Sequence, residues 1–219
     1  MQTPNERETP PAGLYRIDPV HSFAQFRVRH LVVGMVDGRF NTVEGEFSVT
    51  DDVEVRFERI EARLDASSID TGVNARDEDL RSARFFEVES FPVIRYRGTG
   101  SAHLDGGVGT VAGALTIRDV TREVPLDVVL RGTVFDERRG TRVGLSATTK
   151  LSRSDFDLMT ELLEESGEVG AVDVDIRIDV EAVLQAPAST PIEEGGVHRG
   201  TGCRLSAPLR AAPQALVAG

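Results

Sequence analysis

The chain has 219 residues, of which 40% are apolar and 28% are charged, and this balance predicts a soluble globular protein of one or two domains. Its net charge of −11, with Lys150 as the only lysine, excludes the clustered basic surface that nucleic-acid binding needs. No apolar run reaches the roughly eighteen residues that span a bilayer, so stable membrane insertion is not expected.

The N-terminal segment, residues 1–12, is polar and carries Pro10 and Pro11 side by side. It lacks the apolar stretch of a secretory signal, so we expect a flexible start and a cytoplasmic protein. Cys203 is the only cysteine, so no intrachain disulfide can form, which fits a reducing compartment.

From residue 13 to residue 185 apolar side chains recur at alternate positions, the pattern of strands with one buried face. In chain order the runs are 24–28, 43–49, 60–64, 94–96, 111–117, 124–134, 143–147 and 172–184. The last run is the clearest, because Val174, Ile176 and Ile178 share one side while Asp173 and Asp175 share the other. A solvated outer face explains this pair of aspartates better than a cation site does.

A helix is predicted over residues 74–84, with Asn74 as its cap. Acidic residues fall in its first turn and Arg81 and Arg84 in its last, as the helix dipole favours. An aromatic cluster at residues 85, 86 and 91 follows it. A second, weaker helical stretch is predicted from about 157 to 165, with Gly167 as its stop.

Short turns separate the strand runs, at 51–52, 105–107 and 136–140. Connections this short join antiparallel neighbours, because a parallel crossover needs about a dozen residues. The sequence therefore predicts an all-β fold of about eight antiparallel strands, closed into a barrel that can hold one small ligand, with one or two short helices. The tail, residues 186–219, is rich in Ala, Gly and Pro and is predicted to be disordered.

Catalytic and metal-binding patterns are weak. None of the four histidines lies near another histidine or a cysteine at ligand spacing, and His198 lies in the tail, so no metal site is predicted. The glycines of 107–113 run into a strand instead of opening a helix, which argues against a dinucleotide fingerprint. No G-x-S-x-G motif occurs. These observations favour a binding protein without a cofactor over an enzyme.

Six motifs occur in order along the chain: YRIDPVHS at 15–22, FRVRH at 26–30, SIDTG at 68–72, RDEDLRS at 76–82, LTIRDVT at 115–121 and RSDF at 153–156. Together they resemble the signatures of the YceI-like polyisoprenoid-binding family. The resemblance implies a lipocalin-like eight-stranded barrel with a long apolar tunnel for a polyisoprenoid chain, often as a homodimer, with no catalysis and no metal. Three positions depart from the family pattern: Asp79 stands where His is usual, and Asp119 and Asp157 stand where Gly is usual.

The leading hypothesis is non-catalytic binding, transport or storage of a long-chain isoprenoid or related amphiphilic lipid. The residues predicted to line the ligand site are Phe26, Val28, His30, Leu80, Phe85, Phe86, Phe91, Ile94, Tyr96, Leu115, Ile117, Leu145, Phe156, Val174, Ile176 and Ile178. One alternative is an enzyme acting on an isoprenoid or quinone, with an inward His30 near Tyr96. The other is a stress-response interaction protein whose barrel is simply a packed core.

Overall fold

The computed structural model describes residues 9–30, 34–50, 56–136, 138, 140–158 and 173–186, without the side chain of His30. These residues all belong to one compact unit, residues 1–187. The predicted tail lies outside the described residues from 187 onward, as does the predicted second helix beyond Leu158. Within the described part of the chain, no helix is both long and apolar enough to cross a membrane.

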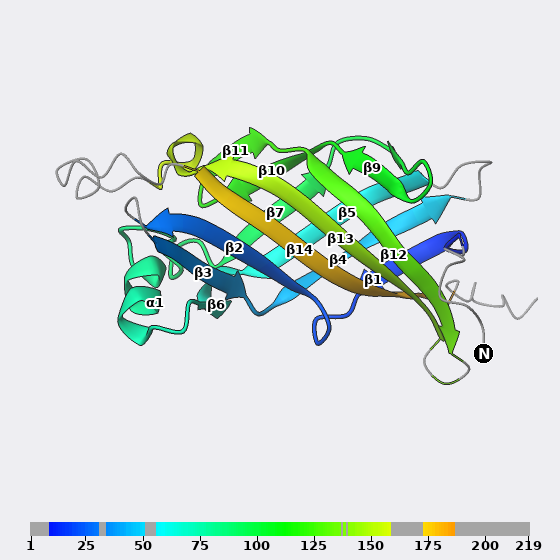
Figure 1. Cartoon of the computed structure of the whole chain (residues 1–219), viewed down its shortest axis with the longest axis horizontal. Helices are drawn as coiled ribbons and strands as arrows, with labels where there is room; N and C mark the ends of the chain where they lie inside the picture. Colours follow the sequence, from blue (N-terminus) through cyan, green and yellow to red (C-terminus); the bar gives the residue numbers. More distant parts are fainter. Residues whose placement is uncertain are drawn as a thin grey trace, which may run out of the picture. The chain divides into compact units, whose positions relative to one another are not determined.

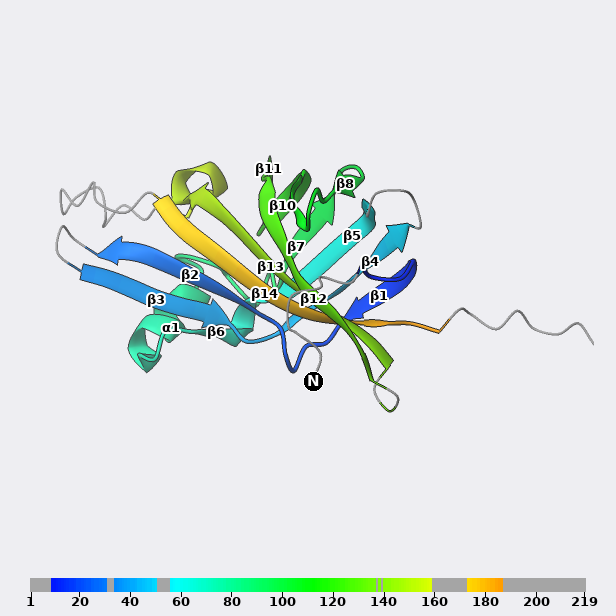
Figure 2. The same ribbon diagram turned by 45° about the vertical axis from the view of Figure 1, so that its right-hand side comes forward.

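The described residues form a single antiparallel sheet with one α-helix and two 3₁₀ turns (Figures 1 and 2). The helix is α1 (Asn74–Arg81), and the 3₁₀ turns are η1 (Ala66–Ser68) and η2 (Arg153–Phe156). The strands are β1 (Gly13–Ile17), β2 (Phe23–His30), β3 (Gly34–Phe40), β4 (Val43–Thr50), β5 (Arg56–Asp65), β6 (Ile69–Asp70), β7 (Val93–Gly98), β8 (Ala102–His103), β9 (Val108–Val111), β10 (Gly113–Ile117), β11 (Val120–Glu123), β12 (Leu126–Asp136), β13 (Gly140–Ser152) and β14 (Asp173–Leu184).

The predicted all-β, antiparallel fold is confirmed, but the described residues contain fourteen strands instead of eight. Neighbouring strands follow the order β11-β10-β7-β5-β4-β1-β14-β13-β12-β9, and the two end strands of this path, β11 and β9, do not pair with each other. The count of eight is wrong because bends divide several continuous runs. For example, Val111 of β9 pairs with Leu126 of β12, and Ala114 of β10 pairs with Glu123 of β11, in the same register. β9 therefore continues into β10, and β11 into β12, as two bent runs that lie side by side.

The alternation of the sequence is realised most clearly in β14, which pairs with β13 on one edge and with β1 and β2 on the other. Val174 is buried and Ile176 is half-buried, whereas Asp173, Asp175 and Arg177 are exposed. The paired aspartates therefore lie on the outer face, as predicted. Because the side-chain period of a strand is two, this register sends the whole apolar row inward.

Helix α1 differs from its prediction at both ends. Its N-cap is Val73, and no side chain caps it there, so Asn74 is the first helical residue instead of the cap. The start of the helix is held by the buried carboxylate of Asp77, which binds the loop before it. This carboxylate accepts hydrogen bonds from the backbone N of Thr71 at 2.9 Å and from the Oγ1 of Thr71 at 2.6 Å. The helix ends before Ser82, whose N–H bonds to the carbonyls of two earlier residues.

Two residues in the left-handed conformation close turns of the chain. Asp157 follows η2 with φ 52°, so aspartate does adopt the conformation that a glycine would favour at this position. At the β10–β11 turn the left-handed residue is Arg118, with φ 55°, and not Asp119. The Arg118 guanidinium lies 3.4 Å from the Glu87 carboxylate and 5.7 Å from the ring centroid of Phe91.

Candidate ligand cavity

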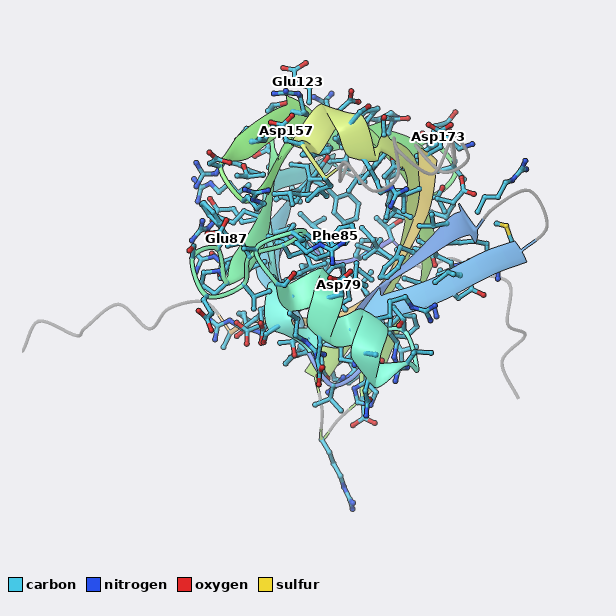
Figure 3. All side chains as sticks on the ribbon, turned by 90° about the vertical axis from the view of Figure 1, so that its left-hand side faces the viewer. Asp79, Phe85, Glu87, Glu123, Asp157 and Asp173 are labelled. Carbon is cyan, nitrogen blue, oxygen red and sulfur yellow. The ribbon has the colours of Figure 1, made fainter. Side chains whose placement is uncertain are left out.

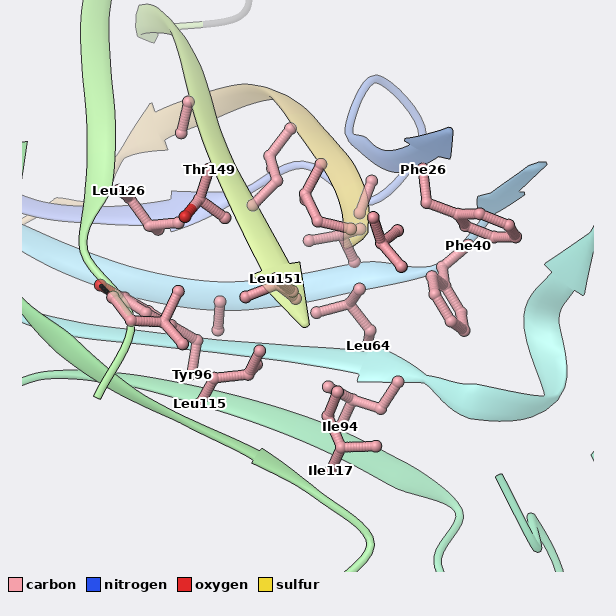
Figure 4. Close-up of a pocket in the computed structure, with 18 of the residues that line it drawn as sticks. Phe26, Phe40, Leu64, Ile94, Tyr96, Leu115, Ile117, Leu126, Thr149 and Leu151 are labelled. Carbon is pink, nitrogen blue, oxygen red and sulfur yellow. Dashed lines mark hydrogen bonds between the residues drawn. The ribbon is translucent and has the colours of Figure 1, made fainter. Parts of the chain in front are cut away.

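The inward rows of the sheet enclose a cavity of about 260 Å³ whose wall is almost wholly apolar. Figure 4 shows Leu64, Ile94 and Leu151 directed into this space from different strands. Its volume is slightly below the range of about 300–1,000 Å³ that is usual for sites of drug-sized ligands. A narrow, flexible apolar chain suits such a site better than a broad ring system does.

Tightly packed aromatic rings close one end of the cavity. Tyr15 and Phe47 stack with their ring centroids 5.4 Å apart, and the ring centroid of Phe57 lies 5.3 Å from that of Phe47. All three side chains are at most 4% exposed. Phe47 and Phe57 also belong to the cavity wall, so this cluster forms its floor.

A second aromatic series lies near α1. The ring centroid of Phe40 is 6.0 Å from that of Phe26 and 5.6 Å, edge to face, from that of Phe86. These three rings belong to the wall, together with Leu80 and Phe85, and all but Phe40 are only partly buried. Figure 3 looks at the molecule from this side and shows Phe85 near the middle of the ring of strands. We call this end, defined by α1, residues 85–86 and η2, the mouth.

The exposed fraction of the inward side chains distinguishes the part of β13 and β14 that is fully packed from the part that borders the cavity. Val143 and Ala182, which face each other across β13 and β14, have no exposed surface. Closer to the mouth, Ala147 and Ile178 face each other in the same two strands and are both only half-buried, as is Ile176. Inward apolar residues keep accessible surface here because they border the cavity instead of packing against a neighbour.

Tyr96 is a wall residue that the enzymatic alternative offers as a possible partner of His30, and its hydroxyl is already hydrogen-bonded. Its single O–H is shared between the carbonyls of Val111 and Val124, each of which lies 3.1 Å from the hydroxyl oxygen. Burial raises the pKa of Tyr96 to about 12, which keeps the phenol neutral at physiological pH. Gly113 makes this placement feasible, because a Cβ atom there would lie 2.3 Å from the Tyr96 hydroxyl.

Fourteen of the sixteen predicted site residues lie on the cavity wall. Phe91 does not, because its ring packs against the Arg118 guanidinium instead. The side chain of His30 lies outside the described part of the chain. The prediction omitted further wall residues, among them Phe40, Val43, Phe47, Phe57, Ile60, Ala62, Leu64, Val128, Ala147, Leu151 and Val180. Most of these lie in predicted strand runs, so the same alternation could have identified them.

A cluster of charged residues lies outside the cavity. Asp18, His21 and Glu181 bring ligand-type atoms within 4.8 Å of one another. Arg142 donates to Asp18 at 2.9 Å and also to Glu181, and the Nδ1 atom of His21 lies 3.0 Å from Asp18. Arg142 already supplies the positive charge that these carboxylates require, so the arrangement is an ion-paired tie between β13, β14 and the β1–β2 connection.

The family assignment rests on residues 15–184, which match the model of the YceI-like domain. Protein YceI of Salmonella newport strain SL254 is 33% identical over 176 residues, covering 80% of this chain and 88% of the relative. The chain belongs to the YceI-like family. Protein YceI of Salmonella arizonae gives the same identity and coverage.

Three solved structures of other proteins show the same fold. The Campylobacter jejuni YCEI protein superposes with a TM-score of 0.61 at 23% identity, covering 72% of this chain and 90% of that one. Burkholderia cenocepacia BcnA superposes with a TM-score of 0.64 at 18% identity, covering 76% of this chain and 99% of that one. A polyisoprenoid binding domain from Saccharophagus degradans superposes with a TM-score of 0.56 at 15% identity, covering 78% of this chain and 98% of that one.

Proposed function

We propose that this YceI-like protein binds a long-chain isoprenoid or a related amphiphilic lipid inside its sheet, for transport or storage and without catalysis. The observation that carries the proposal is the apolar cavity, closed by the Tyr15–Phe47–Phe57 floor and bordered by half-buried apolar residues at the mouth. The fold supports it as well, because the Saccharophagus degradans domain of the same fold is a polyisoprenoid binding domain.

The form of the sheet fits this role. An antiparallel sheet curved around the cavity in this way would form a lipocalin-like barrel, and a barrel of about eight strands has room for one small ligand. The apolar wall supplies affinity in proportion to the ligand surface that it removes from water. At roughly 0.3 kcal/mol per heavy atom, about twenty enclosed carbons give about 6 kcal/mol, which is weaker than micromolar binding. Useful affinity therefore favours a long chain or a well-held head group.

The enzymatic alternative rests on His30, whose side chain lies outside the described residues, with Tyr96 as its possible partner. General acid–base catalysis needs a group that exchanges a proton near the working pH. The phenol of Tyr96 is held by two carbonyls, and its pKa is about 12.

The homodimer that the family resemblance implies stays a prediction, and so does the cytoplasmic location. Val134 and Phe135 on β12 are 62% and 71% exposed and point to opposite faces of the strand, so a dimer interface on either face would cover an apolar side chain.

Organic extraction of the purified protein, followed by mass spectrometry, tests the proposal. We expect an apolar lipid with a long chain in an amount approaching one per protein. The Val134→Trp variant is a matched control for lipid held on the surface, because it enlarges an exposed apolar side chain and leaves the cavity unchanged. Absence of lipid from the extract, together with no uptake of added isoprenoid by the extracted protein, would contradict the proposal.

A further inference from the structure

The floor of the cavity lies beside a bulge in β5. The β4–β5 ladder shifts its register between Glu46 and Ser48, so two residues of β5, Arg59 and Ile60, stand opposite Phe47 alone. Arg59 takes the left-handed conformation, with φ 50°, which accommodates the extra residue. An extra residue in one strand bends that strand and changes the direction of the side chains beyond it.

The bulge decides which side chains of β5 face inward. Ile60, Ala62 and Leu64 alternate along the strand and belong to the cavity wall. In an uninterrupted strand the same alternation would place Glu58 in that row and Phe57 on the outer face. With the extra residue in place, Phe57 belongs to the wall and is 3% exposed. The bulge therefore directs Phe57 into the cavity, next to Phe47.

The far side of the floor is closed by packed groups. The Tyr15 ring, which stacks on Phe47, has no exposed surface, and its hydroxyl donates to the carbonyl of Pro11 at 2.8 Å. Pro10, the preceding residue, is buried, as is Val49 of β4. Burial also raises the pKa of Tyr15 to about 12, because an apolar surrounding disfavours the phenolate. A chain that enters at the mouth therefore meets a closed end at these rings.

Resting on the proposed function, we propose that Phe47 and Phe57 are specificity-determining residues, which set the length of prenyl chain that the cavity encloses. Apolar affinity grows with the surface that is removed from water, so each isoprene unit adds affinity only while it is enclosed. Any further unit stays outside the mouth, in solvent, and adds little. The protein thus distinguishes prenyl lipids by chain length up to this limit and not beyond it.

Val180 offers a position at which the limit can be shortened. Ala182 of β14 has no exposed surface and pairs with Ile17, two residues from Tyr15 on β1. Val180 is the next inward residue of β14 toward the mouth, and it is half-buried and belongs to the wall. It pairs with Leu145 of β13, another wall residue. A larger side chain at Val180 would therefore take up ligand space beside the packed part of the sheet.

The test is the dependence of affinity on chain length, measured by isothermal titration on the lipid-extracted full chain. The probes are prenyl alcohols with one common head group, from geraniol through farnesol, geranylgeraniol and geranylfarnesol to hexaprenol, each an isoprene unit longer than the last. For wild type we expect affinity to rise about tenfold for each unit and then to level off within the series. Beyond that limit, each further unit should change the affinity by less than about twofold.

Two variants should move the limit in opposite directions. Phe57→Ala removes a phenyl ring, whose bulk is close to that of an isoprene unit, so its limit should lie one unit further along the series. The first alcohol beyond the wild-type limit should bind this variant about tenfold tighter than it binds wild type. Val180→Phe should shorten the limit, weakening the longest enclosed alcohol about tenfold and leaving geraniol within about twofold of wild type.

Phe135→Ala is the matched control, because Phe135 is 71% exposed and does not belong to the wall. It should leave the limit where wild type has it. An unchanged limit in folded Phe57→Ala would overturn the assignment and leave the proposed function intact, as would a wild-type affinity that rises through the whole series. If Phe57→Ala does not fold, an unchanged limit in Val180→Phe overturns the assignment instead. If wild type binds none of the alcohols, the proposed function fails, and the chain-length limit fails with it.

Discussion

At the scale of single residues, the ion-paired tie around Asp18 connects distant parts of the chain. The Asp18 carboxylate receives hydrogen bonds from His21 and Arg142, which lower its pKa from 3.8 to about 2. Arg142 also contacts Glu181 of β14, and the backbone N–H of Asp18 bonds to the carbonyl of Glu181 at 2.8 Å. The charged form of Asp18 is therefore favoured in the folded state, which couples stability to pH.

The substitution Asp18→Asn tests this coupling. A carboxylate whose folded pKa is lowered stabilises the fold above its unfolded pKa of about 4, and this contribution disappears as the pH falls toward about 2. We expect the variant to melt below wild type at about pH 7, and the difference to shrink steadily between about pH 4 and pH 2. Melting curves across this range measure it. Asp175→Asn, on a 60% exposed side chain, is the control and should change little. A gap that stays constant with pH would contradict the coupling.

At the scale of elements, α1 shows where a local rule gave the wrong residue. Asn74 is a favourable cap by residue type, but the chain places it inside the first turn. Asp77 holds the preceding loop instead, through the backbone and the side chain of Thr71. Asp77 is 5% exposed, so the loss of its carboxylate would leave buried donors without their acceptor.

Two alanine variants separate these roles. Asp77→Ala should lower the free energy of unfolding by about 1–3 kcal/mol, the usual cost of an unsatisfied buried group. Asn74→Ala should be within about 0.5 kcal/mol of wild type, because its exposed side chain forms no cap. Urea unfolding curves of the two proteins provide the comparison. The reverse order of stabilities would restore the cap that the sequence predicted.

The strands, and which of their alternate residues face inward, were predictable because both follow from the alternation of apolar and polar residues alone. The row of Val174, Ile176 and Ile178 therefore reached the cavity wall as expected. The strand count was not predictable, because it depends on bends such as the one between β9 and β10, which the pattern of apolar residues does not mark. Phe91 was predicted to line the cavity and does not belong to its wall. Its ring makes a cation–π contact with Arg118, which is distant in the sequence, so the local pattern could not reveal this contact.

At the scale of the whole molecule, the account depends on the interior being a ligand space and not a solid core. Ile176 is suited to decide between them, because it lies in the middle of the β14 row, opposite Phe26 of β2 and Thr149 of β13. In a solid core, replacing it with tryptophan would overpack the interior and destabilise the fold by about 1–3 kcal/mol. In a ligand space, the indole would occupy volume that is otherwise available to a lipid chain.

The most direct measurement is the affinity of lipid-extracted Ile176→Trp for geranylgeraniol, determined by isothermal titration beside wild type and the exposed-site variant Val134→Trp. The chain contains no tryptophan, so each variant also carries a single indole whose fluorescence reports its surroundings. The account predicts that Ile176→Trp keeps the stability of wild type to within about 1 kcal/mol and loses about tenfold or more in affinity, since displacing two methylenes costs about 1.6 kcal/mol. Val134→Trp should bind as wild type does. Unchanged affinity in Ile176→Trp, or severe destabilisation of that variant without lipid, would contradict the central claim.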